Sequence, residues 1–146
     1  MALNHFANWE ILPCALGSHK GLAAFNIDRD MAVNSKIAED GTDSADHTIS
    51  VAVEALDDLV REHRVPAPNA IKIDVEGYED HVLAGAGHVF ETARPKLVCE
   101  VHTEPVASRV IDFIEGRNYR WTWIGSYKSY PRHMAADPCG SYSALS

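Results

Sequence analysis

Residues 71–77 read Ile-Lys-Ile-Asp-Val-Glu-Gly and combine a short strand pattern with a sharp turn. Branched side chains alternate with polar ones, so in a strand the branched ones share one face and the polar ones the other. Acidic groups gather toward the carboxyl end, as Asp74 and Glu76. Gly77 then tolerates backbone angles that a side chain would forbid. A functional site belongs here, because open parallel sheets bind ligands beyond the carboxyl ends of their strands.

The chain beyond this strand alternates helix and strand patterns. The expected elements are a strand over Ala70–Val75, a helix over Tyr78–Phe90, a strand over Lys96–His102, a helix over Glu104–Glu115 and a strand over Tyr119–Ile124. Gly85 and Gly87 lower the helix propensity of the first helix. Such alternation predicts βαβ units and an open, mostly parallel α/β sheet whose strands are buried on both faces.

The two ends of the chain are less regular. The amino-terminal half predicts a strand over Trp9–Leu16, a strand over Leu22–Ile27, a long polar loop over Asp28–His47, a strand over Thr48–Val53 and a helix over Val53–His63. The tail from Tyr127 carries turn residues before a last strand over Ser141–Leu145. We treat residues 1–146 as a single domain.

Composition and charge exclude several classes of partner. The 146 residues are 46% hydrophobic, which is typical of a globular domain with one sizeable core. Thirteen basic against 21 acidic residues give a net charge of −8, and the basic residues are scattered, so nucleic acid is not an expected partner. No run approaches the roughly 18 apolar residues of a membrane helix. We therefore expect no membrane partner.

The cysteines and the start of the chain predict a compartment. Cys14, Cys99 and Cys139 are odd in number and widely spaced, which favours reduced core residues over a disulfide framework or a zinc site. The first ten residues lack the basic start and apolar stretch of a secretory signal. Together these features predict a cytoplasmic protein.

Polar side chains also follow the next predicted strand, where Glu100 and His102 end the segment that begins at Lys96. Two neighbouring strand ends would then present the carboxylates of Asp74, Glu76 and Glu100 and one imidazole to a single crevice. The alternative is structural, with Asp74 or Glu76 accepting hydrogen bonds from turn amides and capping the following helix. Glu100 ends an apolar strand, and a buried acid needs a partner.

Several separated segments carry a resemblance to a known family. They are Leu12–Gly17, Val53–Leu59, Ile71–Glu79, Val82–Ala86, Arg94-Pro95 and Glu100–His102. In their order and spacing they resemble the signature of the FkbM methyltransferases. The likeness extends over about residues 9–125 and is densest at about 70–102.

The resemblance implies a Rossmann-like class I methyltransferase sheet and S-adenosylmethionine as the methyl donor. The implied reaction is O-methylation of a hydroxyl on a small molecule or sugar. It places Asp74 near the donor methyl or the acceptor, and Glu76, Glu100 and His102 as further catalytic candidates. His102 is the preferred base, since the ordinary pKa of histidine is about 6.5. Ala15 and Leu16 are expected to flank the adenine.

The same resemblance predicts that the sheet is incomplete at its amino end. The family's glycine-rich donor turn and its ribose-binding acid should precede Trp9, where the chain has eight residues. The absent strands would lie between the Trp9 strand and the Ala70 strand and leave the latter with an open edge. We therefore expect these residues alone to bind S-adenosylmethionine weakly or not at all.

Two other functions stay open from the residues. One is a truncated, non-catalytic remnant, or a half-domain that needs a partner. The other is a metal-dependent enzyme that uses Asp74, Glu100 and His102, with Glu76, as hard oxygen and imidazole ligands. The sequence names neither the methyl acceptor nor the oligomeric state.

Overall fold

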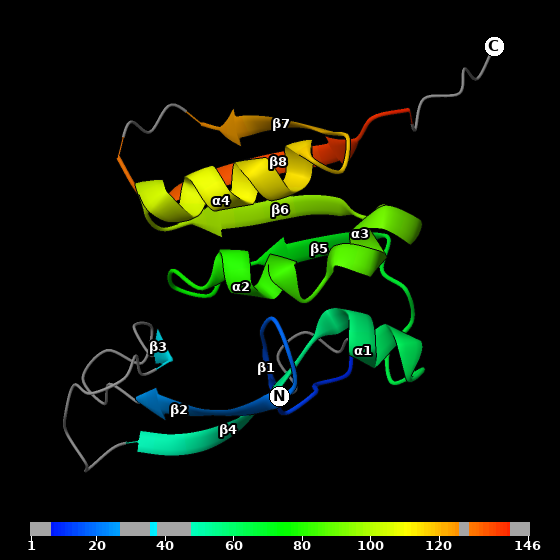
Figure 1. Cartoon of the computed structure of the whole chain (residues 1–146), viewed down its shortest axis with the longest axis vertical. Helices are drawn as coiled ribbons and strands as arrows, with labels where there is room; N and C mark the ends of the chain where they lie inside the picture. Colours follow the sequence, from blue (N-terminus) through cyan, green and yellow to red (C-terminus); the bar gives the residue numbers. More distant parts are fainter. Residues whose placement is uncertain (1–6, 27–35, 38–47, 126–128, 141–146) are drawn as a thin grey trace.

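The computed structural model describes residues 7–26, 36–37, 48–125 and 129–140, which form two four-stranded sheets. The carboxy-terminal sheet has the order β5-β6-β8-β7, with strands Ala70–Ile73, Lys96–Val101, Arg132–Pro138 and Tyr119–Ile124. The amino-terminal sheet has the order β1-β4-β2-β3, with strands Ala15–Leu16, Thr48–Glu54, Gly21–Asn26 and Lys36–Ile37. Figure 1 shows the two sheets one above the other, with the helices on the near side of the upper one. The predicted α/β class is confirmed.

The carboxy-terminal sheet holds the core. Its helices are α2 (Glu79–Ala84), α3 (Gly87–Thr92) and α4 (Glu104–Glu115). Apolar side chains from the helices and from one face of the strands are buried together, including Leu83, Phe90, Leu97, Cys99, Val101, Val110, Ile114 and Met134. Thr103 begins α4, and its side chain accepts a hydrogen bond from the amide of Val106 at 3.4 Å. The predicted bounds of α4 and β7 match the structure.

The prediction of a mostly parallel sheet buried on both faces is wrong in two respects. Of the three hydrogen-bonded strand pairs of this sheet only β5–β6 is parallel, because β8 lies antiparallel between β6 and β7. The face away from the helices is exposed in the described residues, where it carries polar side chains such as Lys72, Lys96 and Arg120. Both βα connections pass over the same face, which leaves the other to solvent.

Strand β8 is absent from the prediction, and the predicted strand over Ser141–Leu145 lies outside the described residues. The β8 sequence Arg-His-Met-Ala-Ala-Asp-Pro has no β-branched residue and ends on a proline, so its intrinsic strand propensity is low. It forms a strand because it hydrogen-bonds on both sides, to β6 and β7. Tertiary pairing overrides local preference here.

The expected helix over Tyr78–Phe90 is two helices. Gly85 ends α2 and Ala86 precedes α3. A Cβ at Gly85 would lie 2.0 Å from the carbonyl oxygen of Gly17, so the backbone approaches here more closely than any side chain permits. Gly85-Ala86-Gly87 is the Gly-x-Gly of the sequence, but it follows a helix rather than a strand, unlike a donor-binding turn.

The amino-terminal segment forms less regular structure than predicted. The expected strand over Trp9–Leu16 is reduced to β1, two residues that pair in parallel with Val53 and Glu54. The expected strand Leu22–Ile27 is confirmed as β2, except for Ile27, which lies outside the described residues. Of the expected loop over Asp28–His47, only β3 is described, and it pairs with the end of β2.

The described strands leave β5 at the edge of its sheet, as the resemblance predicts, because β5 pairs with β6 alone.

Helix α1 (Leu56–Arg61) connects the amino-terminal sheet to this half, and it is shorter than the expected Val53–His63. None of the helices in the described ranges is long and apolar enough to cross a membrane.

Asp57, in the first turn of α1, caps a different helix. Its two carboxylate oxygens accept hydrogen bonds from the amides of His88 and Val89, each at 2.9 Å, at the start of α3. We expect Asp57→Ala to lower the free energy of unfolding by about 1–2 kcal/mol, because two amides at a helix start lose their acceptor. Urea denaturation measures this.

The matched control is Asp58→Ala. Asp58 is the neighbouring carboxylate and pairs with Arg61 within the same helix, at the surface. A surface pair of this kind is worth about 0–1 kcal/mol, so the control is expected to lose less. Equal destabilisation by both substitutions would show that the link from α1 to α3 contributes nothing specific.

Candidate active site

The turn that follows β5 adopts the geometry that the sequence predicts. Gly77 has φ +97°, in the left-handed region that favours glycine. Glu76 also has a positive φ, of 52°, which is uncommon for a residue with a side chain. Such backbone persists where the surroundings hold it and is often found at functional sites. The turn reverses the chain directly into α2 and directs Glu76 toward the end of β6.

The four predicted catalytic residues are brought together. Ligand atoms of Asp74, Glu100 and His102 all lie within 4.8 Å of one another. The Nε2 atom of His102 lies 3.3 Å from Glu76 Oε2 and 4.0 Å from Glu100 Oε1. These four residues form what we call the carboxylate cluster. The expected convergence of two neighbouring strand ends is therefore present.

Asp74 is held in its ionised form by a neighbour on its own strand. Lys72 Nζ donates a hydrogen bond to Asp74 Oδ2 at 2.6 Å. That bond lowers the pKa of Asp74, and the same contact raises the pKa of Lys72. A carboxylate with a lowered pKa is a poor proton acceptor. It is well suited to stabilising a nearby positive charge.

Sequence reasoning missed two residues of the site. Glu79, in the first turn of α2, has a fully buried side chain, and its Oε1 lies 2.5 Å from His102 Nδ1. His133 lies in β8 opposite Glu100, and its Nε2 is 3.2 Å from Glu100 Oε2. His133 was missed because β8 was not predicted.

A signal for Glu79 was present in the sequence. Val82, Leu83 and Ala86 follow it at three, four and seven residues, so Glu79 lies on the buried stripe of its helix. An acid in the first turn of a helix also interacts favourably with the helix dipole, so the position of Glu79 has a second explanation that needs no partner. An acid on an apolar stripe signals a buried charge with a specific partner.

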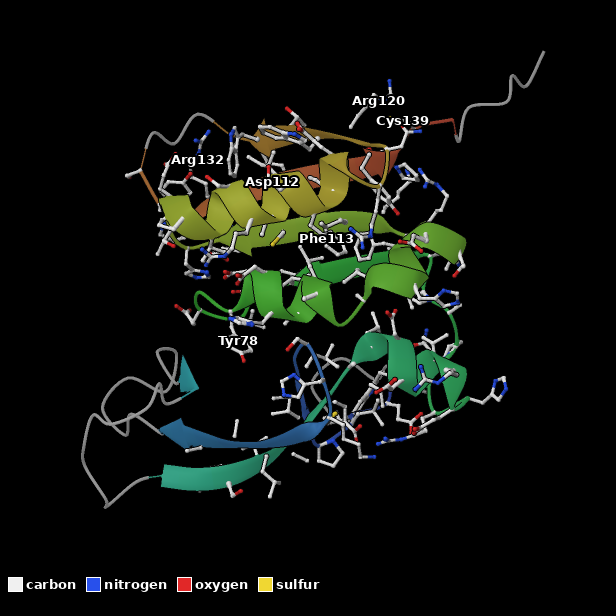
Figure 2. The ribbon with its side chains drawn as sticks, viewed as in Figure 1. Tyr78, Asp112, Phe113, Arg120, Arg132 and Cys139 are labelled. Carbon is white, nitrogen blue, oxygen red and sulfur yellow. The ribbon has the colours of Figure 1, made fainter. Side chains whose placement is uncertain are left out.

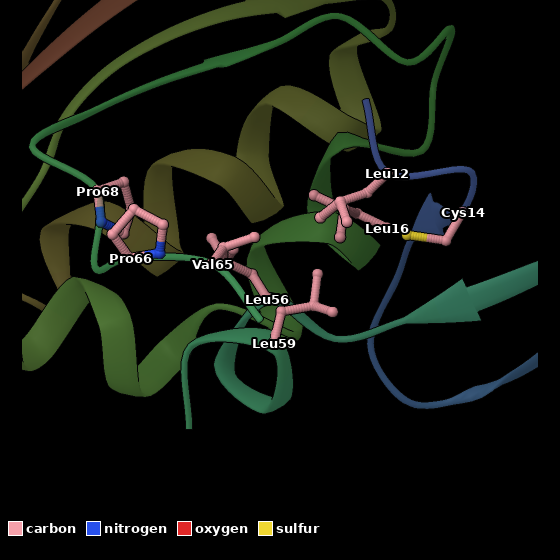
Figure 3. Close-up of a pocket in the computed structure, with 8 residues that line it drawn as sticks. All are labelled: Leu12, Cys14, Leu16, Leu56, Leu59, Val65, Pro66 and Pro68. Carbon is pink, nitrogen blue, oxygen red and sulfur yellow. The ribbon is translucent and has the colours of Figure 1, made fainter. Parts of the chain in front are cut away.

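The structure does not place Ala15 and Leu16 in the carboxylate cluster. Leu16 lines an apolar pocket of about 330 Å³, shown in Figure 3. The other lining residues are Leu12, Cys14, Leu56, Leu59, Val65, Pro66 and Pro68. Pro66 and Pro68 precede β5, so this pocket lies toward the end of the strand opposite Asp74.

The end of β1 nevertheless lies close to the signature turn. A Cβ at Gly17, which follows Leu16, would be 3.7 Å from the ring of Tyr78. Figure 2 shows Tyr78 pointing from the turn toward the amino-terminal sheet. The carboxyl ends of β1 and β5 are thus neighbours, although β1 and β5 belong to different sheets.

The thiol of Cys99 is unlike a catalytic nucleophile. Cys14, Cys99 and Cys139 are all free, but only Cys99 is fully buried, so the expectation of core cysteines is confirmed for that residue alone. Burial raises the pKa of Cys99 to about 12. It therefore stays a neutral thiol on the helix-covered face of β6, beside the cluster but not part of it.

Comparisons with known proteins identify the family of this chain. The sequence matches the Methyltransferase FkbM domain family over residues 3–121. The hexuronic acid methyltransferase AglP of Haloferax volcanii is 36% identical over 70 residues, which cover 47% of this chain and 29% of AglP.

The fold is similar to that of a solved structure. The crystal structure of methyltransferase FkbM from Methylobacillus flagellatus KT superposes with a TM-score of 0.59 and 18% identity, covering 87% of this chain and 28% of that one. The chain thus spans less than a third of the length of either relative. Because the family match covers most of the chain, this protein belongs to the FkbM methyltransferase domain family.

Proposed function

We propose that the carboxylate cluster is the methyl-transfer site of an S-adenosylmethionine-dependent O-methyltransferase that acts on a hydroxyl of a sugar or a related small molecule. The observation that carries the proposal is the convergence of Asp74, Glu100 and His102 at two parallel strand ends. Family membership supports methyl transfer, and the similar AglP is a hexuronic acid methyltransferase. A sugar acid is therefore the first acceptor to test.

The charges of the cluster fit a cationic donor. S-adenosylmethionine supplies a methyl group on a positively charged sulfur. Asp74, kept ionised by Lys72, stabilises that charge, while Glu76 and Glu100 add to the negative potential of the crevice. Ala15 and Leu16 flank the adenine in this proposal, since the end of β1 lies beside the turn after β5.

His102 removes the hydroxyl proton of the acceptor. As the acceptor oxygen bonds to the methyl carbon and the carbon–sulfur bond breaks, the proton passes to His102 Nε2. That atom is the one on the side of Glu76, because Nδ1 faces Glu79. Proton transfer by a positioned side chain contributes about 10²–10⁴-fold to rate.

We also propose a reducing, cytoplasmic compartment, since the three cysteines are unpaired.

Labelled methyl transfer tests this function. The chain is incubated with methyl-labelled S-adenosylmethionine at millimolar concentration and with hexuronic acids or neutral hexoses. We expect O-methylated product and an about tenfold loss of rate in Asp74→Asn, which is about 1.4 kcal/mol of transition-state stabilisation. Asp112→Asn is the matched control, because Asp112 is exposed on α4. No product with any acceptor would favour the non-catalytic alternative.

A divalent cation is the second candidate occupant. Two carboxylates and one imidazole within 4.8 Å provide oxygen and nitrogen ligands of the kind that a divalent transition-metal ion such as Mn²⁺ accepts. Against it, Lys72 already supplies a positive charge to Asp74. Full methyl-transfer activity after treatment with a chelator would remove this candidate, whereas loss that added Mn²⁺ restores would support it.

A further inference from the structure

Glu79 is an unusual residue for the first turn of a helix. Its side chain has an exposed fraction of 0%, while the next acid, Asp80, pairs with Arg109 near the surface. Burying a carboxylate costs free energy unless hydrogen bonds or opposite charge compensate it. The contacts of Glu79 should therefore show why the charge is tolerated.

In the described part of the chain, the hydrogen bonds of this carboxylate all involve one oxygen, Oε1. Glu79 Oε1 accepts a hydrogen bond from the amide of Gly77 at 2.9 Å and lies 2.5 Å from His102 Nδ1. Its Oε2 is buried and has no hydrogen-bond partner in the described part of the chain. A capping role would require only the amide of Gly77. The contact with His102 links the turn after β5 to the end of β6.

In the neutral imidazole ring, that contact places the single hydrogen on Nδ1. A carboxylate oxygen accepts, so Nδ1 carries the hydrogen that lies between the two groups. In the neutral ring Nε2 is then left with its lone pair. Nε2 lies on the side of Glu76, at 3.3 Å, and of Glu100, at 4.0 Å. The ring therefore presents Nε2 to Glu76 and Glu100 of the carboxylate cluster.

We propose that Glu79 is a positioning residue that fixes the orientation and tautomer of His102, with Nδ1–H directed to Glu79 and Nε2 directed into the carboxylate cluster. The use of that nitrogen in proton transfer rests on the proposed function. The orientation itself does not, because it follows from a buried side chain and its contacts. Glu79 touches neither acceptor nor donor in this arrangement and acts only through His102.

The tautomer can be measured without any substrate. Long-range ¹H–¹⁵N correlation NMR distinguishes the two neutral forms of each of the eight histidines, and the signal lost in His102→Ala assigns the residue. At a pH high enough for the imidazole to be neutral, we expect the Nδ1–H form in the unsubstituted chain, whereas a free histidine side chain favours Nε2–H. Finding mainly Nε2–H at His102 would overturn the proposal, whatever the chain catalyses.

Two substitutions separate positioning from simple structural support. Glu79→Gln keeps an oxygen acceptor and is expected to retain the Nδ1–H form. Glu79→Met is apolar and of similar length, and it is expected to shift His102 to Nε2–H. Asp80→Asn is the control, because Asp80 contacts Arg109 and not His102. An unchanged tautomer in a folded Glu79→Met variant would contradict the proposal.

Turnover adds a second readout where methyl transfer is detected. A misplaced base should reduce kcat by about 10–100-fold in Glu79→Met, in the range known for residues that orient a functional histidine. The KM for the donor should change less than twofold, because Glu79 does not face the crevice. If the tautomer shifts but no methyl transfer occurs in any variant, the positioning stands and the proposed function fails.

Discussion

Gly85→Ala is expected to lower the free energy of unfolding by about 3 kcal/mol, as an overpacking change between two backbone segments. The added Cβ would lie 2.0 Å from the carbonyl oxygen of Gly17 and 3.2 Å from the Cβ of Ala55. Neither atom belongs to the end of a flexible side chain, so the backbone itself must move. Urea or thermal unfolding followed by circular dichroism measures the change.

Gly21→Ala is the control for this substitution. A Cβ at Gly21 would meet nothing within 4 Å, so this variant should be neutral or more stable by about 0.5 kcal/mol. The contact at Gly85 also explains why the helix divides, because the end of β1 is packed against the junction between α2 and α3. A Gly85→Ala variant within about 0.5 kcal/mol of the original chain would contradict this packing.

His102→Ala is the second change with a large expected effect. It removes the proposed base, so kcat for methyl transfer should fall by about 100-fold or more. Donor binding should weaken little, since the cationic sulfur is stabilised by the carboxylates and not by the imidazole. Initial rates at saturating acceptor, together with a donor titration, separate the two effects.

His88→Ala is the matched histidine control, because His88 is exposed on α3 and is not a member of the carboxylate cluster. Its kcat should stay within about twofold of the original value. Equal rates for His102→Ala and the unsubstituted chain would show that another group, or none, removes the proton. In that case Glu76 or Glu100 is the next residue to replace.

Local pattern was sufficient to predict α4 and the polar residues that follow β5 and β6. The helical stripe and flanking residues of α4 gave its bounds, and the polar residues after β5 and β6 predicted that Asp74 and His102 converge. These predictions are correct because the formation of short strands and helix caps depends on residues that are neighbours in the sequence. Gly77 likewise has the positive φ that its position in the turn predicts.

Features that depend on distant contacts were not predictable in this way. Strand β8 forms through pairing on both sides, and α2 ends where Gly85 meets Gly17, 68 residues earlier in the chain. The role of Glu79 depends on its distance from His102, in another element. The helical periodicity of a sequence indicates that a residue is buried, but it does not identify the residue that its side chain contacts.

An NMR titration tests most directly whether the methyl donor binds at the ends of β5 and β6. The ¹⁵N-labelled chain is titrated with S-adenosylhomocysteine, the product form of the donor, to millimolar concentration. We expect weak binding, with amide shifts concentrated at residues 15–17, 74–79 and 100–103 and reduced by Asp74→Asn. Shifts confined to the apolar pocket around Leu56 and Pro66, or no shifts at all, would contradict the assignment of the carboxylate cluster as the methyl-transfer site.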